Sequence, residues 1–192
     1  MNTKTILSII GITLANITST TTYAIGTNSE NKGADITLVT ATTKQWQAGR
    51  IVSMAEIKKN GLEHYFCKRN IDNPIFARIY GKSYKTNCTL PRTELRYLQL
   101  LHYTVDGRIM TGEMICHKDI ANDLIEIFRK LYDAHYPIER MQLIDDFGAD
   151  DVTSMNNNNT SCFNYRAVAG SKKLSKHSMG KAVDINPLYN PY

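Results

Sequence analysis

The clearest periodic pattern in the chain is an apolar stripe between residues 118 and 135. Its members lie three or four positions apart, which is the spacing of one face of an α-helix. We therefore predict a helix from about Lys118 to His135, which Pro137 ends because proline has no backbone N–H to donate. The stripe consists of Ile120, Leu124, Ile127, Phe128 and Leu131.

A second pattern predicts a β-hairpin just before this helix. Residues 95–105 and 109–116 are rich in strand-forming side chains, and Asp106 and Gly107 lie between them. An Asp-Gly pair between two such segments is typical of a tight hairpin turn. We expect two antiparallel strands here.

Weaker signals predict the remaining elements. A short helix is expected over residues 51–59, ended by Asn60 and Gly61, because glycine adopts the left-handed conformation of a helix C-terminus. Residues 141–144 read as a strand, and residues 145–159, acidic and then rich in Asn, as a surface loop. Together these elements predict an α+β domain in which helices pack on a small mixed or antiparallel sheet.

The first 24 residues have the pattern of an export signal. Lys4 precedes an apolar run from Ile6 to Ala15, and Thr22 and Ala24 place small residues where a signal peptidase reads them. A buried N-terminal strand or helix is the alternative. The run is too short and too often interrupted by polar residues for a stable membrane span. We expect residues 1–24 to be cleaved and the protein to be exported, to the periplasm or the extracellular space.

Composition narrows the class of protein further. The chain has 192 residues, of which 42% are hydrophobic, so it can bury a core and is neither disordered nor a coiled coil. Its net charge of +5 suits an anionic cell wall or membrane surface. The basic residues are not clustered, so a nucleic-acid partner is not expected. Residues 25–90 carry no motif and are expected to be an extension of unknown role before a domain at 91–192.

The cysteines leave two alternatives open. Cys67, Cys88, Cys116 and Cys162 allow three disulfide pairings in an oxidising compartment. No two of them have the CxxC spacing of a zinc or redox motif. Buried free thiols are equally compatible with the sequence.

Candidate chemistry lies near the end of the chain. His177 and Asp184 are seven positions apart, and Gly180 between them allows the backbone to turn. Residues 182–186 alternate like a strand, which places Asp184 on one face. Imidazole nitrogen and carboxylate oxygen are both good zinc ligands, and a catalytic zinc normally takes three protein ligands. On spacing alone, a hydrogen-bonded surface pair is the more frequent arrangement.

The segment Ser175-Lys176-His177-Ser178-Met179-Gly180-Lys181-Ala182-Val183-Asp184 resembles the Ser-x-His-x-x-Gly-x-Ala-x-Asp signature of the D-alanyl-D-alanine carboxypeptidase family of zinc peptidases. This family includes D-Ala-D-Ala dipeptidases and L-Ala-D-Glu endopeptidases. The similarity extends upstream through residues 159–166, downstream through 185–187, and takes in the helix expected at 118–135.

The resemblance implies a hedgehog/D-Ala-D-Ala-peptidase-like fold and a role for three residues. His177 and Asp184 match two ligands of Zn²⁺, and Arg166 matches the arginine that binds the substrate carbonyl and stabilises the oxyanion. A surface or carboxylate-paired arginine is the alternative for Arg166. Ser175 is expected to shape the ligand loop, because water is the nucleophile in this chemistry.

The sequence departs from the family pattern after Asp184. The family has a Glu general base and a third ligand, a His, downstream of this position, whereas the eight remaining residues contain neither. His117 and His135 read as helix-end residues, and nothing marks Asp145 or Asp146 as a base. We therefore expect a C-terminally truncated form with an incomplete site and weak zinc binding.

Two functions follow from these residues and their resemblance. The first is a zinc metallopeptidase, either a carboxypeptidase, a dipeptidase or an endopeptidase, that hydrolyses amide bonds in peptidoglycan stem peptides. The second is a non-catalytic cell-wall-binding or remnant protein without a complete zinc site. The sequence does not select the bond cut or the oligomeric state.

Overall fold

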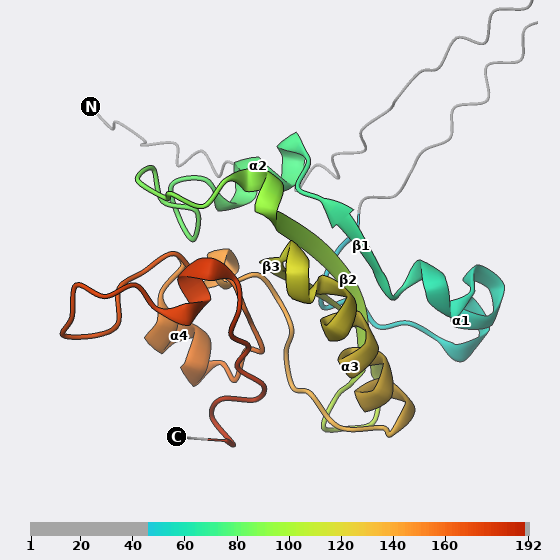
Figure 1. The fold of residues 1–192 in the computed structure, drawn as a ribbon. Coiled ribbons are helices and arrows are strands. Elements are labelled where there is room, and N and C mark those ends of the chain that lie inside the picture. Colours follow the sequence, from blue (N-terminus) through green and yellow to red (C-terminus); the bar gives the residue numbers. More distant parts are fainter. Residues whose placement is uncertain (1–45, 191–192) are drawn as a thin grey trace, which may run out of the picture. The chain divides into compact units, whose positions relative to one another are not determined.

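The computed structural model describes residues 46–190, and residues 47–190 belong to one compact unit (Figure 1). The expected export signal at residues 1–24 and the first part of the expected extension lie outside the described residues. The described unit contains four α-helices and a three-stranded sheet, so the predicted α+β class is confirmed. All strand pairs of this sheet are antiparallel.

The sheet is built around the predicted hairpin. Its strands are β1 (Cys67–Asn70), β2 (Leu95–Tyr103) and β3 (Ile109–His117), in the order β1-β2-β3. The turn closes through a hydrogen bond from the Thr104 N–H to the Arg108 carbonyl at 2.8 Å, and Gly107 adopts a φ of +77°. The hairpin prediction is therefore confirmed.

The four helices are α1 (Met54–Asn60), α2 (Asn73–Ile79), α3 (Ala121–Asp133) and α4 (Asp151–Asn156). The helix α3 packs against β2 and confirms the strongest sequence prediction. Its buried face is slightly rotated from the predicted stripe, since Ile127 is 44% exposed. The buried side chains of this helix are Ala121, Leu124, Phe128 and Tyr132. None of the helices within residues 46–190 has the length and apolar character needed to cross a bilayer.

The start of α1 shows how local chemistry sets an element boundary. The Ser53 hydroxyl accepts the Glu56 N–H at 3.1 Å, so the helix begins after Ser53 and not at residue 51. The Gly61 N–H donates to Ile57 at 2.8 Å with a φ of +79°, which confirms the predicted stop at residues 60–61.

Three of the weaker predictions are wrong. Residues 141–144 are not a strand, because a single hydrogen bond, from the Glu113 N–H to the Met141 carbonyl, joins them to β3. The loop expected at 145–159 contains α4, whose first turn is capped by the Asp150 carboxylate. The strand expected at 182–186 is reduced to one bridge, since Asn186 has a φ of +44° and bends the chain there.

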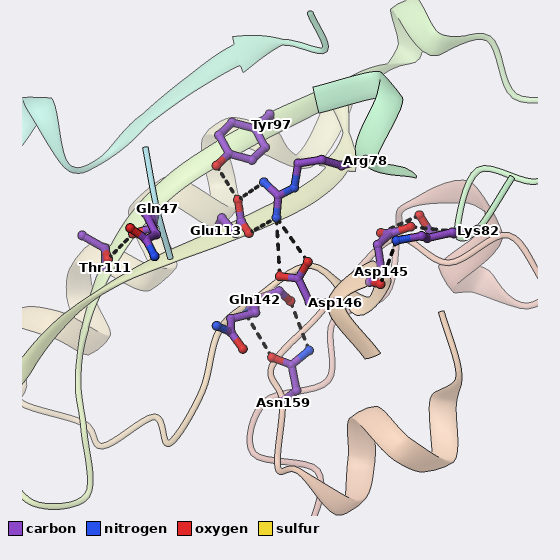
Figure 2. Close-up of polar contacts among 11 residues, drawn as sticks. Gln47, Arg78, Lys82, Tyr97, Thr111, Glu113, Gln142, Asp145, Asp146 and Asn159 are labelled. Atoms are coloured by element: carbon purple, nitrogen blue, oxygen red, sulfur yellow. Dashed lines mark hydrogen bonds and ion pairs between the residues drawn. The ribbon is translucent and has the colours of Figure 1, made fainter. Parts of the chain in front are cut away.

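A buried polar network ties the segment before residue 91 to the sheet. Figure 2 shows the Arg78 guanidinium donating to both carboxylate oxygens of Glu113, at 2.6 and 2.9 Å, while the Tyr97 hydroxyl donates to the same carboxylate. Glu113 is 1% exposed, and Arg78 also pairs with Asp146 at 3.4 Å. The expected boundary at residue 90 therefore falls inside the compact unit.

All four cysteines are free thiols. Cys116 and Cys162 are buried, whereas Cys67 and Cys88 are half-buried. Burial raises the pKa of the Cys116 thiol to about 12 and the pKa of the Cys162 thiol well above its ordinary range. Of the two alternatives from the sequence, the structure has the free thiols.

Candidate functional site

The predicted motif forms a short turn that packs against the end of β3. Residues Lys176–Met179 make one 3-10 turn, and the Ser175 hydroxyl caps it by accepting the His177 N–H at 3.3 Å. Gly180 follows with a φ of +62°. A Cβ at this position would lie 2.7 Å from the His117 nitrogen, so only glycine fits both the conformation and the space.

The structure brings His177 and Asp184 together. The His177 Nε2 lies 3.3 Å from the Asp184 Oδ2, and the two side chains are 11% and 23% exposed. On the other edge of the ring, Nδ1 lies 2.7 Å from the Cys162 carbonyl oxygen. A carbonyl only accepts, so Nδ1 carries a proton and Nε2 is the ring nitrogen that faces Asp184.

The segment 161–164 holds both residues in place. Asp184 and Ser161 exchange two backbone hydrogen bonds, at 3.0 and 3.2 Å. The Asn164 N–H donates to the His177 carbonyl at 3.1 Å, and the Phe163 N–H donates to Ile115 on β3 at 3.0 Å. The two candidate ligands are therefore fixed by main-chain contacts that continue into the sheet.

Arg166 is fixed to the same turn by its backbone. Its N–H donates to the Ser178 hydroxyl at 2.9 Å, and that hydroxyl donates to the Arg166 carbonyl at 2.6 Å. The side chain forms an ion pair with Asp151 through Nε. Of the two alternatives from the sequence, the carboxylate-paired arginine is the state that the structure describes.

Among the described residues, no third ligand joins the pair. Within residues 46–190, no group of three or more His, Cys, Asp or Glu side chains is arranged to hold a metal ion. Figure 2 shows the alternative carboxylates engaged elsewhere, with Asp146 at Arg78 and Asp145 beside Lys82. Asp145 also accepts the Ser83 N–H and hydroxyl, at 3.0 and 2.8 Å, and burial raises the pKa of its carboxyl.

His117 and His135 also lie outside the pair. The His117 ring is buried between Glu94 and Asp119, with ring nitrogens 3.7 and 3.2 Å from their carboxylate oxygens. His135 follows the end of α3 with a φ of +54° and stacks edge-on against Tyr103. Both residues are at helix ends, as expected from the sequence.

Sequence reasoning missed two residues of the site, Asp151 and Asn164. The Asn164 side-chain amide donates to the Asp151 Oδ1 at 2.9 Å, while the Asp151 Oδ2 pairs with Arg166. Asp151 falls within the segment expected to be a loop, so nothing in the sequence placed it beside Arg166. One signal could have predicted the helix that carries Asp151, namely the pair of acidic residues at 150–151, which is typical of a helix N-terminus.

A cavity of about 450 Å³ lies elsewhere in the unit. It is lined by the hairpin turn and by residues 139–142, and His177, Asp184 and Arg166 do not line it. The lining includes His102, Asp106, Arg108, Glu139 and Arg140. The predicted chemistry and this cavity are therefore separate features of the molecule.

Comparisons of this chain with known protein families, with curated proteins and with solved structures found no match. The proposed function therefore depends on the motif residues and on their geometry.

Proposed function

We propose that His177 and Asp184 are two ligands of a zinc ion in a peptidase of the D-alanyl-D-alanine carboxypeptidase family. The substrate proposed is an amide bond in a peptidoglycan stem peptide. The observation that carries the proposal is the 3.3 Å separation of the His177 Nε2 and the Asp184 Oδ2, while Nδ1 is held by the Cys162 carbonyl.

This separation fits two ligands of one tetrahedral zinc. Two donor atoms, each about 2.0–2.1 Å from a tetrahedral metal, are about 3.3 Å apart. Without a cation or a proton between them, a lone pair and an ionised carboxylate at this distance repel each other. The hydrogen bond from Nδ1 to the Cys162 carbonyl is also the outer contact that zinc-bound histidines usually make.

The chain's own residues have distinct roles in this proposal. His177 and Asp184 bind the ion, and Arg166 binds the carbonyl oxygen on which negative charge develops. Zinc, when bound, polarises the scissile carbonyl and lowers the pKa of water. Ser175 and Gly180 hold the turn that carries His177 and take no part in bond cleavage.

Three further features support a wall substrate. The first 24 residues have an export pattern, which would deliver the protein outside the cytoplasm. Removal of residues 1–24 takes away Lys4 and no acidic residue, so the net charge falls from +5 to +4 and still favours anionic surroundings. The antiparallel sheet with packed helices is compatible with the hedgehog/D-Ala-D-Ala-peptidase-like fold, which is part of the proposal.

A second candidate function is a non-catalytic cell-wall-binding protein. One observation favours it, namely that within residues 46–190 no group of three or more His, Cys, Asp or Glu side chains is arranged to hold a metal ion. A catalytic zinc normally has three protein ligands and an open position. In this case the protein would bind stem peptides without cleaving them.

The test is incubation of the purified chain with muropeptides, with and without added zinc, followed by mass spectrometry. The peptidase proposal predicts a zinc-dependent product that His177→Ala abolishes and that His64→Ala, at an exposed position, leaves unchanged. A product that persists in His177→Ala would contradict the proposed site. Binding of muropeptides with no product at any zinc concentration would favour the second candidate.

A further inference from the structure

The contact between Arg166 and Asp151 has a specific form. Asp151 approaches the guanidinium at Nε, the nitrogen nearest the side-chain stem. Its other oxygen, Oδ1, accepts the Asn164 amide N–H at 2.9 Å. One carboxylate oxygen therefore lies in an ion pair with Arg166 and the other accepts a hydrogen bond from Asn164, so rotation of the carboxylate would disturb both contacts.

Asn164 connects this contact to the turn that carries His177. Its backbone N–H donates to the His177 carbonyl at 3.1 Å, and its side chain reaches Asp151 and the Ala149 carbonyl. The residue is 3% exposed, and its Oδ1 has no hydrogen-bond partner among residues 46–190. A buried acceptor without a donor is costly, so this side chain is held in place for the contacts that its amide nitrogen makes.

A carboxylate at Nε has a defined consequence for an arginine. It restricts the position of the guanidinium at Nε, while the two outer nitrogens lie beyond it, and one of them, Nη1, donates to the Ala167 carbonyl at 3.4 Å. The Arg166 and Asp151 side chains are 29% and 28% exposed, so a ligand can reach them. An ion pair this exposed contributes little to folding stability, which makes a purely structural role a weak explanation.

We infer that Asp151, supported by Asn164, is a positioning residue that orients Arg166 towards a carbonyl or carboxylate oxygen of the stem peptide. This inference depends on the proposed function, since it takes Arg166 as the group that touches the substrate. In this inference, hydrogen bonds of Asn164 connect Asp151 on α4 to the turn that carries His177. They hold Arg166 and the proposed metal ligand His177 at a fixed position relative to each other.

The first test compares Asp151→Asn with the parent in the full chain. The probe is a disaccharide-pentapeptide muropeptide, and kcat, KM and zinc affinity are measured for each variant. A displaced arginine is expected to lower kcat/KM about 10- to 100-fold, chiefly through kcat. Zinc affinity is expected to stay within about threefold, because Asp151 does not touch the metal ligands. An unchanged kcat/KM in Asp151→Asn overturns the inference.

Asp150→Asn is the matched control. Asp150 is the neighbouring carboxylate, and its Oδ1 accepts the Thr153 N–H at 2.7 Å at the start of α4. Asparagine is an equally good residue at a helix N-terminus, so the helix should keep its stability. We expect kcat/KM within about twofold of the parent, and a loss equal to that of Asp151→Asn would mean that α4, not the ion pair, is responsible.

The second test does not require turnover. The Arg166 Nε–H proton is followed by NMR in the zinc-free protein and identified by its loss in Arg166→Lys. The inference predicts a resonance protected from water exchange in the parent and at least about tenfold faster exchange in Asp151→Asn. Unchanged exchange overturns the positioning role even if the protein cleaves muropeptides. A parent that binds no zinc and cleaves nothing overturns the proposed function instead.

Discussion

His102 and His177 each make the same kind of hydrogen bond through Nδ1, but the surroundings of their Nε2 atoms differ. Each Nδ1 lies 2.7 Å from a backbone carbonyl, that of Ile138 for His102 and that of Cys162 for His177. In both rings Nδ1 therefore carries a proton, and Nε2 is the nitrogen whose surroundings differ. The His177 Nε2 lies 3.3 Å from the Asp184 carboxylate, whereas the His102 Nε2 is buried without a hydrogen-bond partner among residues 46–190.

The difference separates a candidate ligand from a core residue. His102 lies within β2 and is 2% exposed, and burial lowers the pKa of its ring. The His177 side chain lies on a turn and is 11% exposed, and that of its neighbour Asp184 is 23% exposed. A locked tautomer alone does not make a metal site, because a carboxylate and access to solvent are also needed.

The largest expected effect concerns the turn that presents His177. Gly180→Ala should cost about 3 kcal/mol of stability, because a left-handed φ is combined with a Cβ 2.7 Å from the His117 nitrogen. Gly107→Ala is the matched control, since its φ is +77° but a Cβ there meets nothing within 4 Å. This control should cost about 1 kcal/mol. Urea unfolding measures both, and equal losses would show that the close contact at Gly180 is not the cause.

A smaller effect should appear at His102 when the pH is lowered. Because the pKa of the folded ring lies below the ordinary value, the unfolded chain takes up a proton first as the pH falls past about 6.5. The contribution of His102 to the free energy of unfolding should thus be fully present above this pH and should decrease below it. Asp106 and Glu139, on the same cavity, have lowered pKa values and stay ionised across this range.

The measurement is urea unfolding of the parent and of His102→Gln at about pH 7.5 and about pH 5.5, on either side of the ordinary histidine pKa. Gln keeps an N–H donor for the Ile138 carbonyl and does not titrate. The parent should lose more stability than the variant between the two pH values. An equal loss in both proteins would show that His102 is not the group responsible.

The smallest effect is expected at Asp184. In the absence of zinc, Asp184→Asn should change the free energy of unfolding by less than about 1 kcal/mol, because a partly exposed pair contributes little. Asn retains the backbone bridge to Ser161. Thermal or urea unfolding of the metal-free protein measures the change. A loss above about 3 kcal/mol would mean that the pair serves folding and not ion binding.

Local signals predicted the elements that local chemistry determines. Asp106 and Gly107 specified the hairpin turn, and the apolar spacing specified α3. The segment 141–144 was wrongly predicted as a strand, because its pairing with β3 is limited to one hydrogen bond that no local pattern reveals. The helix α4 was not predicted, because the acidic and Asn-rich composition of residues 145–159 favoured a loop and Asp150 was not recognised as a helix cap.

The site was predictable to a similar extent. The sequence indicated that Gly180 lets the chain turn between His177 and Asp184, and the two side chains do lie 3.3 Å apart, although the strand expected at 182–186 is absent. The partners of Arg166 were not predictable, since Asp151 is distant in the sequence and meets it only through the fold. The contact of the His177 ring with the Cys162 carbonyl was not predictable either, because every residue has a backbone carbonyl and its use as an acceptor leaves no pattern in the sequence.

Zinc affinity of the parent, His177→Ala and His102→Gln, measured by competition with a chromophoric chelator, decides whether His177 is a metal ligand. We predict that one zinc binds the parent. We predict that His177→Ala weakens binding about 100-fold or more, since losing a ligand costs more than losing its outer contact. His102→Gln should stay within about threefold of the parent, because it lies outside the site. Equal zinc affinity in His177→Ala and the parent would contradict the proposed metal site.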